Sequence, residues 1–433
     1  MSDLFKVRLG DIAKVKGGKR LPAGSEFSST ITAHPYLRVT DMVNSTINEA
    51  FLVFVSPEIE QRIRNYKISK DDLYVTIAGT LGNFGTIPDK LDQALLTENA
   101  AKITGINYDF YDKNFIKYYL TSDLVQSQIT KVIGIGGGVP KLPLYRIEAL
   151  ELELPKFSIQ KYISAILSSI DSVISKTETA IEKYKSIKQG LMQDLFTRGI
   201  DVKTGKLRLS YNQAPELYKQ TKLGFIPKDW DTTINLKSTY IKGRIGWEGL
   251  KASEFIKEGS FLVTGTDLLN GKIDWSTCYH ISEFRFQEAP SIHLRNDDLV
   301  ITKDGTIGKT AIVKNCPEKA ILNSGLFVMR CKDYSYYNKF LYYILNTEIF
   351  YSHLRKTQGG STINHLYQRE FEKFEFPIPS KPEQEKIITT LENQERKIEQ
   401  EENYLNKIKN IKTGLMQVLL TSKKRVKLHE KAN

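Results

Sequence analysis

Residue types that could perform chemistry are present in this chain, but none lies in a recognisable catalytic arrangement. The run from Gly134 to Gly138 is rich in glycine, as phosphate-binding loops are. Pro140 and Lys141 follow it where a P-loop requires Lys-Ser or Lys-Thr at the start of a helix, so a nucleotide-hydrolysing site is not expected there. A methyltransferase would need a glycine-rich cofactor loop after a strand and a Pro-Pro-aromatic motif, and the sequence contains neither.

Histidines and carboxylates are spaced for structural roles. The histidines form no His-Glu-x-x-His motif and have no cysteine at zinc spacing, which predicts surface or packing positions for His34, His280, His293, His353, His365 and His429. Glu395–Lys397 has the letters of a nuclease Glu-x-Lys motif, but it falls in a heptad-patterned helix, so we expect a solvated helix face. The paired carboxylates Asp71–Asp72 and Asp297–Asp298 begin strand-like runs, which favours turns over metal binding. We predict no catalytic and no metal-binding residue.

The composition favours a soluble protein with a polyanionic partner. Lys and Arg number 62 against 50 Asp and Glu, and the resulting formal charge of +12 is typical of proteins that bind nucleic acid. No run of about 18 apolar residues exists, which predicts no membrane span. The polar start Met1–Lys6 is not a signal peptide. Cys278, Cys316 and Cys331 lack metal-ligand spacing, so we expect reduced thiols in a cytoplasmic protein.

The element that would position any binding residues is a long helix predicted over residues 160–195. Its seam alternates steps of four and three, which is the a/d heptad pattern of a coiled coil. The seam consists of Ile163, Leu167, Ile170, Ile174, Thr177, Ile181, Tyr184, Lys188, Leu191 and Leu195.

The same heptad seam occurs a second time, at a constant offset of 224 residues. The second seam consists of Ile387, Leu391, Gln394, Ile398, Glu401, Leu405, Ile408, Lys412, Leu415 and Leu419. The helix ends match too, because residues 188–197 and 412–421 are identical at seven of ten positions. Two ordinary amphipathic helices in one core would also show apolar stripes, but a heptad kept in register across a long repeat favours a paired-helix rod.

The segments before the two helices repeat a common frame. Residues 71–82 and 297–308 are identical at seven of twelve positions, at an offset of 226. Strands are predicted at 36–39, 73–77, 151–154, 261–264 and 374–379, and helices at 114–129 and 337–351. Elsewhere the two segments differ, since Gly24–Ser29 has no counterpart near Trp247. A shared frame with dissimilar surface stretches is what two readers of two different ligands would look like.

Helix geometry then predicts the architecture. A helix of about 36 residues is about 54 Å long, and a second helix that pairs with it must run back, so the pair is antiparallel. We expect two α/β (α+β) domains, one at each end of two long antiparallel coiled-coil helices, related by a pseudo-twofold internal duplication. The expected segments are a first domain at 1–157, a first helix at 158–198, a linker at 199–223, a second domain at 224–379, a second helix at 380–421 and a basic tail at 422–433.

Loops rich in Gly, Lys, Arg, Thr and Asn suit DNA. Small residues let backbone amides approach phosphate, cationic side chains neutralise it, and Arg, Lys, Asn and Gln read base edges. The candidates in the first domain are Lys16, Lys19, Arg20, Arg38, Thr80, Asn83, Lys141 and Arg146. Those in the second are Lys242, Arg244, Lys303, Thr306, Lys309, Gln358, Ser361, Thr362 and Asn364. Any single one could be an ordinary surface residue, but both domains place such residues at equivalent loops.

The layout resembles the specificity subunit of Type I restriction-modification systems. The likeness is carried by residues 36–39, 71–73 with 79–82, 297–299 with 304–308, 223–227 with Trp230, 377–379 with 383–385, and the Gly-Leu-Met-Gln runs at 190–193 and 414–417. The first copy departs at Lys156–Gln160, which replaces the Pro-Glu-Gln entry of the second helix. It also has Ile77–Ala78 where the second copy has Lys303–Asp304, so a role of those two residues common to both copies is not expected.

The resemblance implies that two target-recognition domains each bind one half of a bipartite, asymmetric site on double-stranded DNA. It also implies that the helix pair sets the spacer and binds methyltransferase (modification) subunits, expected to be two, joined by restriction/translocase subunits. No cofactor is expected in this chain, because S-adenosylmethionine, ATP and magnesium belong to the partner subunits that methylate adenine or cleave DNA.

Two other readings stay open. One is a fused restriction-type enzyme with its own DNA methylation or cleavage activity, which the lack of a catalytic motif disfavours. The other is a coiled-coil adaptor for proteins only, which would leave the duplicated basic domains unexplained.

Overall fold

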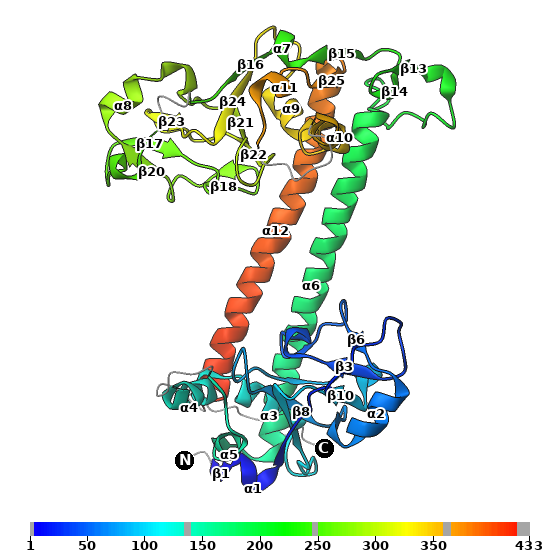
Figure 1. The fold of residues 1–433 in the computed structure, drawn as a ribbon, viewed down its shortest axis with the longest axis vertical. Coiled ribbons are helices and arrows are strands. Elements are labelled where there is room, and N and C mark those ends of the chain that lie inside the picture. Colours follow the sequence, from blue (N-terminus) through cyan, green and yellow to red (C-terminus); the bar gives the residue numbers. More distant parts are fainter. Residues whose placement is uncertain (1–3, 134–139, 245–249, 358–364, 422–433) are drawn as a thin grey trace, which may run out of the picture. The chain divides into compact units, whose positions relative to one another are not determined.

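The computed structural model describes residues 4–133, 140–244, 250–357 and 365–421. These residues form two compact units: unit 1 is Met1–Thr179 with Asn403–Asn433, and unit 2 is Ala180–Glu402. Both units combine helices with small sheets (Figure 1). The long helices α6 (Phe157–Thr197) and α12 (Lys381–Leu419) each contribute residues to both units, so unit 1 consists of two stretches of sequence and unit 2 of the stretch between them.

Unit 1 contains two four-stranded sheets and two strand pairs. The antiparallel sheet β2-β11-β8-β9 consists of Lys14–Gly17, Ala100–Thr104, Leu73–Thr76 and Phe84–Thr86. The sheet β6-β3-β10-β7, in which β3 and β10 are parallel, consists of Val53–Phe54, Pro35–Leu37, Ala94–Leu96 and Lys67–Ile68. β1 (Phe5–Arg8) pairs antiparallel with β12 (Glu151–Leu154), and β4 (Met42–Val43) with β5 (Thr46–Ile47). The helices are α1 (Leu9–Ile12), α2 (Pro57–Ile63), α3 (Lys113–Leu120), α4 (Asp123–Ile133) and α5 (Leu144–Glu148).

Unit 2 repeats this arrangement. The antiparallel sheet β16-β24-β21-β22 consists of Thr239–Lys242, Leu326–Cys331, Leu299–Thr302 and Thr310–Ile312. The sheet β20-β17-β23, with β17 and β23 parallel, consists of Tyr279–Ile281, Ser260–Val263 and Ala320–Leu322. Two further strand pairs are β15 (Asp231–Ile234) with β25 (Glu375–Ile378) and β18 (Leu268–Leu269) with β19 (Lys272–Ile273). The helices are α7 (Asn235–Ser238), α8 (Glu283–Gln287), α9 (Asn338–Ile344), α10 (Glu348–Thr357) and α11 (Gln368–Phe371).

The predicted strands of both copies are present, but each predicted aromatic helix is broken in two. The expected helix at 114–129 is α3 followed by α4, and that at 337–351 is α9 followed by α10. At the breaks the backbone N–H of Ser122 donates to the carbonyl of Tyr119 at 3.1 Å, and the backbone N–H of Thr347 donates to the carbonyl of Ile344 at 3.0 Å. These bonds span three residues and end each α-helix in a tight turn, which apolar periodicity does not record.

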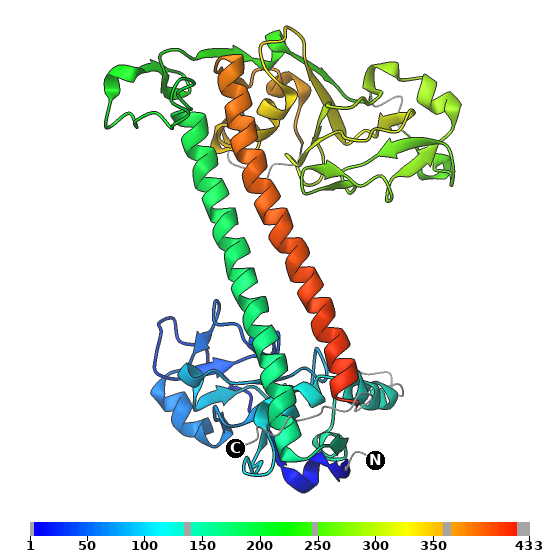
Figure 2. The ribbon, with the colours of Figure 1, turned by 180° about the vertical axis from the view of Figure 1, so that it is seen from behind.

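The long helices pair antiparallel, and the ion pairs follow the sequence repeat. In unit 1, Asp171 contacts Lys412 at 2.6 Å and Glu178 contacts Lys409 at 2.7 Å. In unit 2, Glu395 contacts Lys188 at 2.8 Å and Glu402 contacts Lys185 at 3.2 Å. Every acid and every base of the second set lies 224 positions from its counterpart in the first. The repeated heptads are therefore used twice in one register, once in each unit. The ribbons of the two helices can be followed in Figure 2.

The predicted heptad seam is the contact between the helices. Ile163, Leu167, Ile181, Ile387 and Leu391 are buried, and the remaining seam residues are buried or half-buried, whereas most positions between them are exposed. The seam ends in the cores of the units. Unit 1 packs the start of α6 and the end of α12 against the sheet, and unit 2 packs the start of α12 and the end of α6 likewise. Burial of these apolar side chains fixes where each helix begins and ends.

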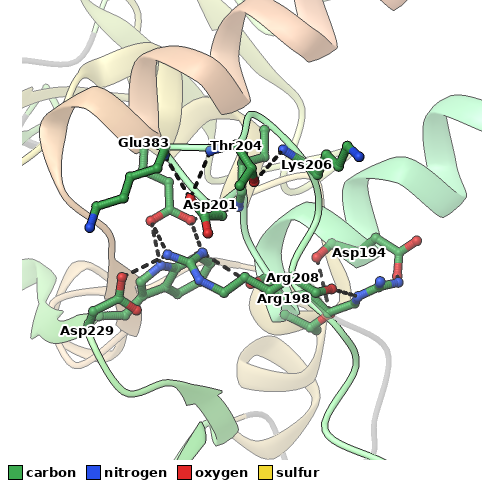
Figure 3. Close-up of polar contacts among 12 residues, drawn as sticks. Asp194, Arg198, Asp201, Thr204, Lys206, Arg208, Asp229 and Glu383 are labelled. Carbon is green, nitrogen blue, oxygen red and sulfur yellow. Dashed lines mark hydrogen bonds and ion pairs between the residues drawn. The ribbon is translucent and has the colours of Figure 1, made fainter. Parts of the chain in front are cut away.

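The stretch expected to be a polar linker is partly folded. β13 (Tyr218–Thr221) and β14 (Gly224–Pro227) form a hairpin, and its turn contains the expected boundary between residues 223 and 224. A buried carboxylate ties this stretch to α12 (Figure 3): Glu383 accepts from the Arg208 guanidinium, from Trp230 Nε1 at 3.1 Å and from the backbone N–H of Ile200 at 2.8 Å. Burial alone would lower the pKa of Arg208, but the hydrogen bond and charge of Glu383 outweigh it and raise that pKa.

Candidate nucleic-acid interface

In both units two hydrogen bonds of one threonine hydroxyl stabilise the loop after the central strand. These loops, residues 76–83 in unit 1 and 302–309 in unit 2, are called the latch loops. In unit 1 the buried hydroxyl of Thr76 donates to the carbonyl of Thr80 and accepts from the N–H of Asn83 at 3.0 Å. In unit 2 the hydroxyl of Thr302 makes the same two hydrogen bonds within loop 302–309, at 2.5 and 3.0 Å. The equivalent threonines at the two strand ends thus stabilise the same loop conformation in both units.

The glycines of these loops are required by backbone geometry. Gly79 and Gly82 have φ angles of 80° and 72°, and Gly305 and Gly308 have 69° and 85°. This left-handed region is accessible to glycine at little cost. At Gly82 a side chain would also come within 2.9 Å of Ile129. The identical Gly-Thr-x-Gly motifs are therefore a backbone requirement, and the residues around them are free to differ.

Each loop is joined to a second segment by an isolated antiparallel bridge. The bridge in unit 1 pairs Ala78 with Lys141, and that in unit 2 pairs Asp304 with His365. In both, the N–H of the buried leucine that follows donates to the carbonyl before the first member, at 2.9 Å in unit 1 and 2.8 Å in unit 2. Two chain segments therefore meet at the same place on the same frame.

Five predicted residues of unit 1 are exposed. Lys16 lies on β2, and Lys19 and Arg20 follow that strand. The Lys19 ammonium is 5.7 Å from the centre of the Tyr66 ring, and Arg20 Nε is 2.7 Å from a Glu98 oxygen, although 78% of the Arg20 side chain is exposed. Thr80 and Lys141 lie at the latch loop and its bridge. These side chains are accessible to a ligand.

Three other predicted residues of unit 1 are engaged by their own chain. Arg38 makes two hydrogen bonds to buried Asp41, at 2.8 and 3.1 Å, and the hydrogen bond to Asp41 raises the pKa of Arg38. The amide of Asn83 donates to the Met42 carbonyl at 2.7 Å, and Arg146 Nε donates to the Tyr145 hydroxyl at 3.2 Å. Arg38 and Asn83 hold loops, so their first role is positional.

In unit 2 the predicted residues divide in the same way. Lys242, Thr306 and Lys309 are exposed, and Lys303 is half-buried with its ammonium 5.0 Å from the centre of the Phe327 ring. Arg244 is only 2% exposed and donates from Nε to the Leu322 carbonyl at 3.3 Å, so its guanidinium is directed into the protein and the prediction of a DNA contact is not supported. The remaining candidates, Gln358, Ser361, Thr362 and Asn364, lie outside the described residues.

The carboxylates behave as the sequence predicts at the strand starts, but not on α12. Asp72 and Asp298 each accept the N–H of the residue three positions earlier, at 2.9 and 2.8 Å, which confirms their turn role. The prediction of a solvated face for Glu395–Lys397 is confirmed for Arg396 and Lys397 but wrong for Glu395, which is half-buried and accepts from Lys188 and, at 2.9 Å, from the Tyr343 hydroxyl. In the described part of the chain no three His, Cys, Asp or Glu residues are grouped as a metal site would require.

His293, His353 and Cys278 lie in packed surroundings. The His293 ring stacks on Phe286 at 3.8 Å, and burial lowers the pKa of His353. The three cysteines are free thiols, as predicted, and burial raises the pKa of Cys278 to about 12. None of the helices that the structure describes is long and apolar enough to cross a membrane.

Sequence reasoning missed two features of unit 2. The contact between the Asp304 carboxylate and His365 Nδ1 was not expected, and neither was the buried ion pair of Glu383 with Arg208. A signal for both existed in the repeat, because the first copy has Ala78, Lys141 and Ile159 at the equivalent positions. Positions where two copies of one frame differ in charge are the ones to inspect.

Comparison with known proteins gives consistent matches over most of the chain. The family model described as Type I restriction modification DNA specificity domain matches residues 1–186 and 246–410. The MjaVIII type I restriction enzyme specificity subunit of Methanocaldococcus jannaschii is 27% identical over 433 residues, covering 97% of this chain and 93% of that protein. The EcoBI specificity subunit of Escherichia coli is 22% identical over 396 residues, covering 90% of this chain and 78% of that protein.

Two solved structures share the fold. One is the S subunit of a Type I restriction-modification system from M. genitalium, with a TM-score of 0.55, 15% identity and 96% of each chain covered. The other comes from work on complex assembly and conformational transition of the type I R-M system, with a TM-score of 0.56, 16% identity, and 96% of this chain and 97% of that chain covered.

Proposed function

Because this chain belongs to the Type I restriction-modification DNA specificity family, we propose that it is the DNA specificity subunit of such a complex. The observation that carries the proposal is the duplicated latch loop. Two units hold one backbone frame by the same threonine hydroxyl and the same glycines, while the exposed residues around the frame differ. A frame used twice with different exposed chemistry suits recognition of two different sequences.

In this proposal the two recognition domains, residues 1–157 and 224–379, each bind one half of a bipartite, asymmetric site on double-stranded DNA. Exposed Lys16, Lys19, Arg20 and Lys141 would serve the first half, and Lys242, Thr306 and Lys309 the second. Cationic side chains supply affinity through phosphate contacts, which any sequence offers. Specificity must then come from side chains that reach base edges beside them.

The helix pair, residues 158–198 and 380–421, would set the spacer between the half-sites. The 224-residue relation among the four ion pairs supports a pseudo-twofold axis through the antiparallel pair, as the symmetry of duplex DNA would match. The 41 residues of α6 correspond to about 60 Å of helix, against about 34 Å for one turn of DNA. The proposal therefore places one recognition domain at each end of a rod.

Exposed faces of the helices would bind the methyltransferase subunits, one at each copy of the repeat. Gly190, Gln193 and Thr197 on α6 are repeated as Gly414, Gln417 and Thr421 at the end of α12. A side chain at either glycine would meet nothing within 4 Å, so packing within this chain does not require glycine there. Glycine inside a helix is about 0.5–1 kcal/mol less favourable than alanine, and close approach of a partner would account for keeping it twice.

Catalysis and cofactors belong to the partners in this proposal. Methyltransferase subunits would bind S-adenosylmethionine and methylate adenine, and restriction/translocase subunits would use ATP and magnesium. The alternative is a fused restriction-type enzyme that modifies or cuts DNA by itself.

A genome map of modified adenines, with and without this gene, tests the proposal. A two-part motif with a fixed gap that vanishes on deletion is the expected result, and no lost motif would contradict an active specificity subunit. The purified chain is also incubated with DNA, S-adenosylmethionine and magnesium. Methylation or cutting by the chain alone would favour the fused enzyme.

A further inference from the structure

The two bridges at the latch loops place a pair of side chains at one position of each unit. Ala78 pairs with Lys141 and Asp304 pairs with His365. The hydrogen bond just beyond each pair makes it the non-hydrogen-bonded pair of an antiparallel bridge, in which the side chains lie closest and share one face. In unit 2 the contact is direct, since His365 Nδ1 donates to the Asp304 carboxylate.

The two pairs differ in charge although their frame is the same. Ala78 with Lys141 carries one positive charge, whereas Asp304 with neutral His365 carries one negative charge, and with protonated His365 none. Of the side chains in unit 2, 45% of Asp304 and 32% of His365 is exposed. If these positions were in the core, their different residues could be explained by packing. They are partly exposed and the backbone is the same in both units, so the fold does not require the difference.

The neighbours of each pair are suited to phosphate. Exposed Thr80 lies in the first loop, and exposed Thr306 and Lys309 lie in the second. If both pairs also served phosphate, the two would need the same sign of charge. A carboxylate beside phosphate is repelled, so a phosphate role does not fit Asp304. Base edges present both hydrogen-bond donors and acceptors, so they can bind a negatively charged or a positively charged side chain.

We propose that positions 304 and 365 in unit 2, and 78 and 141 in unit 1, are specificity-determining positions that contact base edges of the two half-sites. Asp304 would accept hydrogen bonds from the amino group of cytosine or adenine, with His365 fixing its carboxylate, and Lys141 would donate to guanine acceptors. The proposal rests on the proposed function, and it names the residues by which equivalent loops read different bases.

The test exchanges the pairs within the full chain. Variant A carries Asp304→Ala and His365→Lys, which gives unit 2 the pair of unit 1, and variant B carries the reciprocal Ala78→Asp and Lys141→His. Each is produced with its own partner subunits, and modified bases are mapped in the host genome. Binding of each purified complex to a randomised duplex library gives base preferences and salt dependence. Lys237→Ala, an exposed lysine on α7 outside the loops, is the charge control.

The expected result is that variant A changes the preferred bases in one half of the motif and variant B in the other half, with the gap unchanged. Discrimination at the affected base pair should change about 5- to 150-fold. The control should leave both halves as they are.

Three outcomes would overturn the inference. One is an unchanged motif in both variants, and another is a change in both halves from one variant. The third is a shift in affinity that is equal for all sequences, with a changed salt slope, because that is the signature of phosphate contacts. If the complex of a variant methylates nothing, the conservative variants Asp304→Asn and His365→Gln are made instead, and their base preferences are measured by binding to the randomised library. Base preferences equal to those of the wild type would then refute the inference. A wild-type chain that defines no motif would refute the proposed function, and with it this inference.

Discussion

The proposal that the helix pair sets the distance between the recognition domains can be tested directly. Because Glu178 faces Lys409 and Lys185 faces Glu402, the heptad opposite residues 174–180 is residues 405–411. Deleting both heptads removes one complete layer, including the Glu178–Lys409 ion pair, and leaves the layers on either side with their partners. The apolar seam stays continuous, since seven residues are one heptad.

The size of the effect follows from helix geometry. Seven residues at 1.5 Å each shorten the rod by about 10 Å, which corresponds to about three base pairs. Three base pairs also turn the DNA by about 100°, so the shortened protein meets its second half-site on another side of the duplex. Inserting three layers lengthens the rod by about 32 Å, or about nine base pairs, which is close to one full turn and restores the phase. The lost ion pair is exposed and contributes about 0.2–1 kcal/mol to stability.

The assay is binding of each purified complex to duplexes that carry both half-sites with spacers varied one base pair at a time. We expect the three-layer insertion to prefer a spacer about nine base pairs longer than wild type, and the one-layer deletion to bind its best spacer more weakly. The melting temperature of each variant is the control for folding. An unchanged optimum spacer in the insertion variant would refute the reasoning, because the helices would then not set the distance.

Four further predictions concern single residues. Gly190→Ala should raise the free energy of unfolding by about 0.5–1 kcal/mol in denaturant titrations, because its Cβ meets nothing, and a loss of stability would contradict the described helix surface. Glu383→Gln should lower the free energy of unfolding by about 3 kcal/mol, because it removes the buried charge that pairs with half-buried Arg208 and leaves that guanidinium only its exposed partner Asp229; Glu385→Gln is the exposed control, and equal effects would refute the role. Cys278, with its pKa raised to about 12 by burial, should be alkylated at pH 8 far more slowly than a cysteine in a short peptide, and equal rates would show an accessible thiol. Lys309→Ala should weaken binding equally for all sequences and reduce the slope of log affinity against log salt by about one, whereas a change in base preference would assign it to base reading.

Patterns that repeat along the chain predicted the helices and the duplication. The heptad seam of α6 and α12 is buried as expected, and even Thr177 and Gln394, polar members of the seam, are buried. The antiparallel orientation of the pair was also predicted, because a second helix that pairs with the first must run back along it, whereas the register comes from the ion pairs of the structure. Periodicity is a local property, so it can be read without knowing what lies opposite.

The breaks between α3 and α4 and between α9 and α10 were not predicted. At each break a backbone N–H, that of Ser122 or of Thr347, bonds to the carbonyl three residues earlier, a local change that leaves the apolar pattern undisturbed. The candidate site was predicted only in part, because residue type does not show which side chains are engaged within the protein. Residue type identified exposed Thr80 and Lys309, but it also selected Arg38 and Arg244, which have the right chemistry and are engaged within the protein.

What the sequence by itself determined is the duplicated frame, its two heptad helices and the absence of a recognisable catalytic motif. What only the tertiary structure decided is which charged side chains face each other. Glu383 meets Arg208 across 175 residues, and Asp304 meets His365 across 61. A charge in a sequence has the same letter whether it is solvated, paired or buried. Its role depends on neighbours that the fold brings from far along the chain, because electrostatic interactions act through distance and dielectric rather than through sequence position.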